Sequence, residues 1–193
     1  MYITQCEGCG KSTPDYDITH FGSIESGYRK LCSLCFNADV AQRWGHEDFE
    51  NIRLESIAIT DGAGQIRQFH FRTHLLGPMV SLDAFELQEG EPAGYQFQLI
   101  GNPQDDLFVL LGRMIEKIRR ALATIHLEVG AHGLQIKDLL VRGNIDFDPD
   151  CDERMPLLTI DGQQISWEEF GHMLMTFEGW QFRLEMFDRS DEP

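Results

Sequence analysis

The sequence predicts an α+β protein in which a small four-cysteine zinc finger precedes a mostly antiparallel sheet packed by two helices. Two CxxC pairs lie near the start of the chain, several later runs alternate apolar with polar residues, and two stretches carry apolar residues at helical spacing. We expect the finger over residues 1–45 and the α+β domain over 52–193. An alternative division splits the latter into two subdomains, 52–128 and 132–188.

Length and charge limit the classes of function. The chain has 193 residues, and 42% of them are hydrophobic. It is therefore long enough to bury a sizeable core, and a metal is not needed to hold the whole chain together. Its formal net charge is -16, and the acidic excess is greatest after residue 147. Such a surface repels nucleic acids and anionic membranes. No apolar run has the length of a membrane span and no signal peptide is visible, so we expect a cytoplasmic protein.

The first half of the larger domain reads as a sheet followed by a helix. Asn102-Pro103 breaks the strand pattern, and Asp105 or Asp106 can cap a helix that should run to about His126. Its apolar residues recur every three or four positions, which is typical of a helix with one buried face. The strands expected before it are Ile52–Thr60, Ile66–Leu75, Leu82–Leu87 and one around Tyr95–Leu99.

The second half of the domain reads as a strand, a hairpin, a helix and a last strand. Asp161-Gly162 supplies the tight turn of the hairpin, and Ser166 with Glu169 forms a capping box that starts the helix. We expect strands over 139–147, 157–160 and 163–165, and a last one over 180–186, where apolar residues alternate. We also expect five aromatic side chains to be buried in one cluster, namely Trp167, Phe170, Phe177, Trp180 and Phe182.

The cysteines carry the clearest chemical signal. Cys6 and Cys9 form one CxxC pair, and Cys32 and Cys35 form another 22 residues later. Each pair places two sulfurs on one tight turn, so both can bind the same ion. Four thiolates complete a tetrahedron and leave no open position, which is typical of a structural rather than a catalytic zinc. We therefore expect one zinc ion per chain, held by these four residues.

Two parts of the chain resemble known families. Cys6-Glu-Gly-Cys9-Gly10 and Leu31-Cys32-Ser-Leu-Cys35-Phe36 resemble the knuckles of zinc ribbons and treble-clef fingers, and a helix after the second knuckle favours the treble clef. The resemblance implies a zinc site and little about function, because the class includes nucleic-acid binders, protein-interaction modules and structural staples. The later segments Ile160-Asp-Gly, Ser166-Trp-Glu-Glu-Phe-Gly171 and Glu178-Gly-Trp-Gln-Phe182 resemble domains of uncharacterised bacterial proteins, which brings no activity.

Three other groups of residues are weaker candidates for a functional site, and an ordinary structural role is favoured for each. His70, Arg72 and His74 share one face of a predicted strand and could contact a small anion, although alternation favours an ordinary solvated face. The acidic run over 146–153 departs from a calcium-binding EF-hand, which needs glycine and glutamate where the chain has Cys151 and Leu157. Acidic neighbours should raise the pKa of the Cys151 thiol, which argues against a nucleophile there.

The sequence contains no GxSxG, P-loop, GxGxxG or HExxH motif. We therefore expect a non-enzymatic cytoplasmic adaptor that binds another protein. One alternative is an enzyme or small-anion-binding protein with its site around His70, Arg72 and His74. A second is a nucleic-acid-binding finger, which is disfavoured because residues 1–45 hold five acids and only four bases. The sequence does not indicate the oligomeric state.

Overall fold

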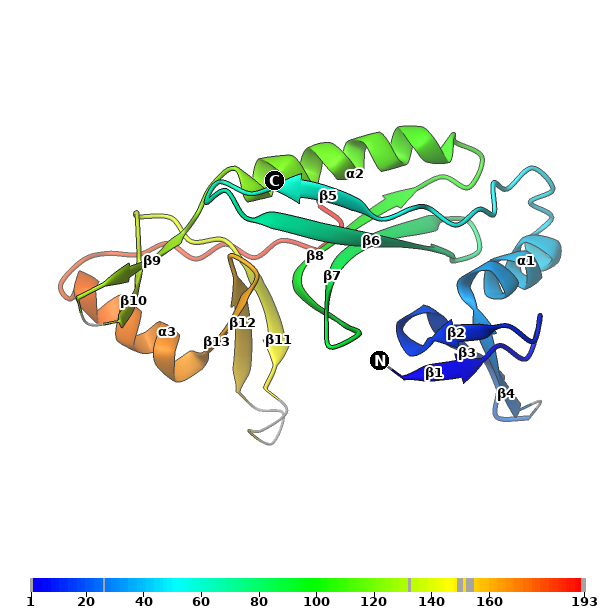
Figure 1. The fold of residues 1–193 in the computed structure, drawn as a ribbon, viewed down its shortest axis with the longest axis horizontal. Helices are drawn as coiled ribbons and strands as arrows, with labels where there is room; N and C mark the ends of the chain where they lie inside the picture. The colour runs from blue at the N-terminus through cyan, green and yellow to red at the C-terminus, as the bar shows by residue number, and fades with distance from the viewer. Residues whose placement is uncertain (1, 26, 132, 149–150, 152–154, 192–193) are drawn as a thin grey trace.

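The computed structural model describes residues 2–25, 27–131, 133–148, 151 and 155–191. The chain forms three parts that follow one another in the sequence, and the central sheet lies between the other two (Figure 1). Every strand pair described is antiparallel, so the α+β class with an N-terminal cysteine cluster is confirmed. The described helices include none with the length and apolar character needed to span a lipid bilayer.

The N-terminal part is the finger. Two short hairpins precede a twelve-residue helix, and a 3-10 turn, η1, joins the hairpins. The helix begins directly after Cys32 and ends at Gly45, whose φ of 71° suits a residue without a side chain. The elements are β1 (Ile3–Gln5), β2 (Ser12–Pro14), η1 (Asp15–Asp17), β3 (Ile18–Ser23), β4 (Gly27–Cys32) and α1 (Ser33–Trp44).

The central part is a four-stranded sheet in the order β5-β6-β7-β8 with α2 packed on one face (Figure 1). Asp106 caps α2, because its side chain accepts a hydrogen bond from the Phe108 N–H at 2.7 Å. Its buried positions, among them Met114 and Ile118, complete the core with residues of β6, β7 and β8. The elements are β5 (Ile57–Thr60), β6 (Ile66–Leu75), β7 (Val80–Gln88), β8 (Glu91–Gly101) and α2 (Leu107–Leu122).

The C-terminal part has its own smaller core. A two-stranded and a three-stranded sheet pack against a short helix whose capping box joins Ser166 and Glu169, as predicted. Residues 149–150 and 152–154 of the acidic run lie outside the described residues. The elements are β9 (Leu127–Gly130), β10 (Gly133–Ile136), β11 (Asn144–Phe147), β12 (Pro156–Ile160), β13 (Gln163–Ser166), α3 (Trp167–Leu174) and η2 (Met175–Phe177).

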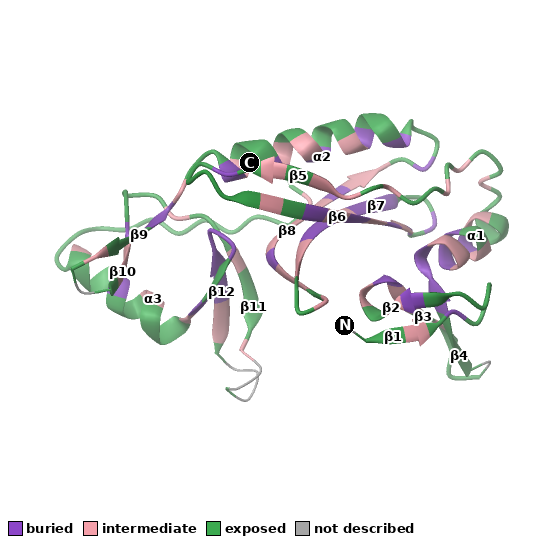
Figure 2. Ribbon diagram, in the orientation of Figure 1, coloured by how far each residue is buried: buried purple, intermediate pink, exposed green. Residues whose placement is uncertain are grey.

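The structure corrects the predicted C-terminal strand and aromatic cluster. Residues 180–186 form no strand, and the segment runs back from α3 as an extended trace toward α2 (Figure 1). Only Phe170 and Phe177 border the core of this part. Trp180 is 64% exposed and Phe182 is 89% exposed, and Figure 2 shows the segment in the colour of exposed residues. The alternating pattern was real, but it has no partner strand in the described part of the chain.

Candidate metal centre and the cleft beside it

The four predicted cysteines meet at one point of the finger. Their sulfur atoms all lie within 4.8 Å of one another, and those of Cys9 and Cys32 are 4.0 Å apart. Four sulfurs bound tetrahedrally to one ion at about 2.3 Å would lie about 3.8 Å from each other. The cluster therefore has the size and the donor set to hold a metal ion.

The backbone around the cluster explains why these residues form two tight turns. Gly10 has a φ of 74°, which glycine adopts without strain, and its N–H donates to the Cys6 carbonyl at 2.8 Å. A Cβ at Gly8 would lie 3.0 Å from the Cys35 sulfur, so a larger residue would crowd the site. The Cys32 N–H donates to the Cys6 sulfur at 3.2 Å. The first turn and the start of α1 are thus joined at the cluster.

Electrostatics within the cluster also favour a bound cation. Burial opposes ionisation of Cys6, but hydrogen bonds from the backbone of Cys32, Cys9 and Gly8 outweigh it and lower the pKa of Cys6 to about 6. Burial and the neighbouring thiols raise the pKa of Cys35 instead. One site thus favours a thiolate while its neighbours resist further negative charge. A divalent cation at the centre would relieve that repulsion.

The remaining cysteine is separate from this group. All five cysteines lie among the described residues, and none of them forms a disulfide. Cys151 is exposed in the C-terminal part, far along the chain from the cluster. The arrangement agrees with the prediction that only four cysteines act together.

The finger is docked on the central sheet. Asn37 of α1 is fully buried, and its side-chain amide donates to the Thr73 carbonyl of β6 at 3.0 Å. Its side-chain oxygen accepts from the Leu75 N–H at 2.8 Å. Leu75 also completes the apolar cluster of the finger, in which Phe36 is buried. The finger and the edge of β6 therefore share one packed interface.

His70, Arg72 and His74 lie at this interface, so the predicted solvated face is wrong. His74 shares a hydrogen bond of 3.0 Å with the Thr19 hydroxyl of the finger, and its ring meets the Phe36 ring edge-on. Arg72 donates to the Tyr16 carbonyl of η1. All three side chains are half-buried because the finger covers this face of β6. Alternation identified the face but could not show what covers it.

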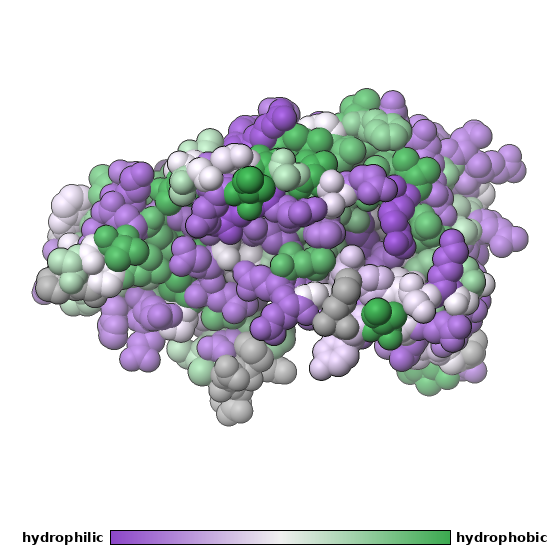
Figure 3. Space-filling view, in the orientation of Figure 1, coloured by the Kyte–Doolittle hydropathy of each residue, from purple (hydrophilic) through white to green (hydrophobic). Residues whose placement is uncertain are grey.

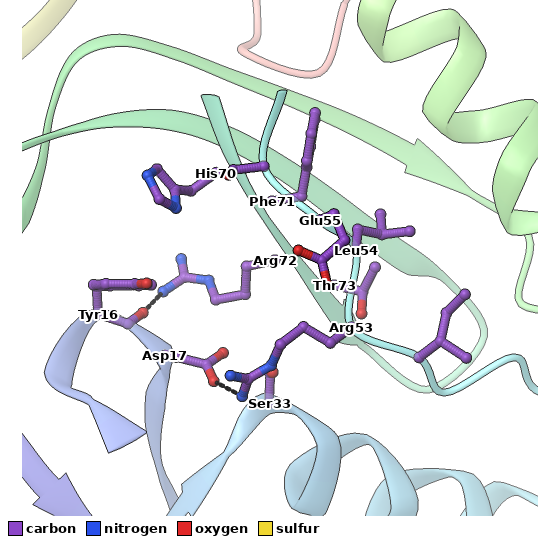
Figure 4. Close-up of a pocket in the computed structure, with 12 residues that line it drawn as sticks. Tyr16, Asp17, Ser33, Arg53, Leu54, Glu55, His70, Phe71, Arg72 and Thr73 are labelled. Carbon is purple, nitrogen blue, oxygen red and sulfur yellow. Dashed lines mark hydrogen bonds and ion pairs between the residues drawn. The ribbon is translucent and has the colours of Figure 1, made fainter. Parts of the chain in front are cut away.

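A polar cleft of about 170 Å³ lies between the finger and the sheet (Figure 4). His70 and Arg72 line it from β6, and Asp17 lines it from the finger. Arg53 crosses it and forms an ion pair of 2.8 Å with Asp17. The Arg72 guanidinium pairs with Asp83 at 3.2 Å, but its buried Nε has no hydrogen-bond partner among the described residues. An unpaired buried donor is costly, so this atom marks where a ligand or water could bind.

Sequence reasoning missed the polar residues that join the parts. Asn37, Asp17 and Arg53 act through contacts between distant segments, and no local spacing distinguishes them from ordinary surface residues. A second such group is centred on Arg67, which donates to the Asp161 carbonyl of the C-terminal part at 3.4 Å. There Arg67 forms ion pairs with Asp61 at 2.9 Å and Glu86 at 3.5 Å. Only the folded topology brings these residues together.

Comparison with known proteins gives families but no activity. The chain is similar to three domains of unknown function, DUF7685 over residues 5–47, DUF7686 over 50–123 and DUF7713 over 126–191. Each match covers less than half of the chain, and none is described as a zinc finger. No curated protein and no solved structure matches. The predicted resemblance to uncharacterised domains is confirmed at that level.

Proposed function

We propose that this protein is a non-enzymatic adaptor that binds another protein, with a zinc ion acting only as a structural staple. The observation that carries the proposal is the segment after η2, residues 180–187, here called the C-terminal segment. Its large apolar side chains are 60–89% exposed, namely those of Trp180, Phe182, Leu184, Met186 and Phe187. Soluble monomers seldom expose apolar side chains in such a continuous row, and a row of this kind is typical of a protein-binding surface.

Zinc is the metal that this proposal assigns to Cys6, Cys9, Cys32 and Cys35. Four thiolates are the usual ligands of structural zinc and leave no place for substrate. The order of a knuckle, a hairpin and a helix that starts at the second knuckle supports a treble-clef finger. A reducing cytoplasm would keep the thiols available for the metal, so a cytoplasmic location is part of the proposal.

The finger's contacts argue for stapling rather than for binding nucleic acid. Asp39 pairs with Arg29 at 3.0 Å and with Arg43 at 2.7 Å. Half of the basic side chains of residues 1–45 are therefore engaged with a carboxylate of the same segment. Binding a phosphate backbone needs several cations free to displace counterions. These ion pairs support the expectation that nucleic acid is not the partner.

The test of the adaptor function is site-specific photo-crosslinking with the full chain. Phe182 would be replaced by p-benzoylphenylalanine, which keeps an aromatic side chain there, and the zinc-loaded protein would be irradiated in native cell extract. The matched control carries the same probe at Phe108, which is 57% exposed on α2. We expect an adduct with a different polypeptide from position 182 and none from position 108. Equal labelling from both positions, or none from 182, would contradict the function.

The cleft favours a second candidate function, the binding of a small anion. Arg72 and Arg53 place two guanidinium groups at its wall, and the Arg72 Nε has no hydrogen-bond partner in the part of the chain that the structure describes. Asp17 and Glu55 also line the cleft and offset that positive charge, so this candidate ranks below the adaptor. Calorimetric titration with inorganic phosphate tests it. Binding that is lost in Arg72→Gln would favour this site, and absence of binding in the wild type would exclude phosphate as its ligand.

A further inference from the structure

The C-terminal segment has the residue pattern of a strand but no partner strand. Trp180, Phe182, Leu184 and Met186 alternate with mostly polar residues, which is typical of a strand with one buried face. In the described part of the chain, no backbone N–H or C=O of residues 181–187 forms a hydrogen bond with another backbone group. Exposed backbone groups of this kind are a template for pairing with a strand from another chain.

Both ends of the C-terminal segment are fixed, so the segment loses little further conformational entropy when it pairs with another strand. At the start, the Trp180 N–H donates to the Phe177 carbonyl at 2.9 Å, and their rings meet edge-on at 5.8 Å. At the end, Lys117 of α2 donates to the carbonyls of Arg189 at 3.0 Å and Asp191 at 2.6 Å. A binding segment that is held extended before the partner arrives loses less freedom when it binds.

The charges of the segment indicate which partner fits. Arg183 and Glu185 flank Leu184, so the segment is complementary to itself in the antiparallel direction. If Leu184 lies on a two-fold axis, each Arg183 faces Glu185 of the second copy, and each Phe182 faces Met186 of the second copy. Opposite charges and apolar pairs directly across two strands are stabilising. The free chain already pairs Arg183 with Glu185 internally, but that exposed pair contributes little.

Other registers are worse for the same reason. Moving the register by two residues in one direction places Arg183 opposite Arg183 of the second copy. Moving it in the other direction places Glu185 opposite Glu185. Either shift brings like charges together, and an odd shift turns the apolar faces away from each other. The sequence therefore selects the register centred on Leu184.

We propose that residues 180–187 pair antiparallel with the same residues of a second copy, forming a two-fold symmetric dimer. The inference rests on the proposed function, because it uses the same exposed surface: a second copy occupies this surface when no other protein is bound to it. A two-stranded ribbon alone is marginal, so its apolar face needs cover. A groove of about 370 Å³ is lined by Trp180 itself, by the apolar Ile136, Leu139 and Phe177, and by polar residues that include Lys137 and Asp138. In the dimer, Met186 of the second copy lies diagonally across from Trp180, and its side chain is buried against this groove. Figure 3 shows apolar side chains in several groups among hydrophilic ones on one face of the molecule.

The experiment is charge reversal with the full, zinc-loaded chain, read by sedimentation equilibrium. Arg183→Glu places like charges opposite each other twice in each dimer, and so does Glu185→Arg. Each single variant is expected to weaken dimerisation about tenfold. The double variant, Arg183→Glu with Glu185→Arg, restores both opposite-charge pairs and is expected to return the dissociation constant to within about threefold of the wild type. Because both side chains are exposed, circular dichroism should show the same fold in all four proteins.

Three results would overturn the dimer. The wild type could stay monomeric at about 100 µM, neither single variant could weaken the dimer, or the double variant could dimerise no more tightly than the single variants. These results are separate from the crosslinking test at Phe182. A monomeric chain that captures a different polypeptide would refute self-pairing and retain the adaptor function. A dimer that each single charge reversal weakens and the double variant restores, in a chain that captures no other polypeptide, would support self-pairing and refute the adaptor function.

Discussion

Asn37 and Leu75 join the finger to the central sheet through a hydrogen bond of 2.8 Å, which the Leu75 N–H donates to the Asn37 side chain. The same side chain donates to Thr73, so its amide replaces a neighbouring strand at this edge of β6. Both residues are fully buried. The contact explains how a small finger can be held at a fixed place on a larger domain.

Replacing Asn37 with Ala should therefore destabilise the protein. The change leaves the Leu75 N–H and the Thr73 carbonyl buried without these partners, which costs about 1–3 kcal/mol. Urea unfolding at pH 7.5 measures the free energy. The control is Gln68→Ala, which removes an exposed hydrogen bond to Ser56 and should change stability by less than about 0.5 kcal/mol. Equal losses of unfolding free energy in the two variants would mean that Asn37 does not hold the finger on the central sheet.

Removing the metal should unfold the finger and leave the central sheet folded. Cys32→Ser takes away one ligand, and a segment of this size buries too little on its own to stay folded. The core between the sheet and α2 contains no residue of the finger among its buried members. Limited proteolysis of the variant should give a stable fragment that begins near residues 46–52. Complete digestion at the same protease concentration would show that the sheet depends on the finger.

The docked finger should make stability depend on pH through His74. Burial, together with the charge of Arg72, lowers the pKa of His74. Unfolding returns the pKa to about 6.5, so the unfolded chain binds this proton more readily. Stability from this group is complete above about pH 6.5 and is lost progressively as the pH falls from that value toward the lower pKa of the folded state. His74→Gln should lose less unfolding free energy than the wild type between pH 7.5 and 5.5, measured in urea. An identical loss in both proteins would contradict the burial of this side chain.

Truncations in the C-terminal part should separate its core from its exposed segment. Met173 is 5% exposed and belongs to the core of this part, so Met173→Ala should cost about 2–5 kcal/mol. Phe182 is exposed, so Phe182→Ala should change the stability of the monomer by less than about 0.5 kcal/mol. Thermal unfolding at low protein concentration measures both. A large loss from Phe182→Ala under those conditions would mean that the aromatic cluster is buried after all.

Local signals in the sequence were sufficient for several features. The capping box of Ser166 and Glu169 and the cap at Asp106 depend on neighbours within three residues, and both are present. Asp161 and Gly162 have φ angles of 52° and 72°, as the predicted tight turn requires. The cysteine cluster was also predictable, because each CxxC pair defines half of a metal site. These features share one property: the residues that make them are close in the chain.

Features that depend on distant residues could not be predicted in this way. The helix expected to reach His126 ends at Leu122. The N–H groups of His126 and Leu127 donate instead to Asp161, each at 2.8 Å, and the Leu122 carbonyl accepts from Gly62. The strand expected over 139–147 begins only at Asn144. Helical spacing and alternation carry no information about such contacts.

The first expected strand is shortened in the same way, since residues 52–56 line the cleft and only Ile57–Thr60 pair with β6. Arg53 in this stretch pairs with Asp17 of the finger rather than with a neighbouring strand. The prediction of a strand over 180–186 was wrong for a different reason. Its pattern is that of a strand, but pairing needs a second strand, and we propose that another copy of the chain provides it.

The metal content and thiol reactivity of the purified chain test the central claim most directly. Native mass spectrometry gives the number of zinc ions, and a thiol reagent counts accessible cysteines before and after chelation. The account predicts one zinc per chain and one thiol that reacts before chelation, the exposed Cys151, with Cys6, Cys9, Cys32 and Cys35 reacting only after the metal is removed. A reduced chain without metal, a chain with two zinc ions, or five thiols that react in the zinc-loaded protein before chelation would contradict it.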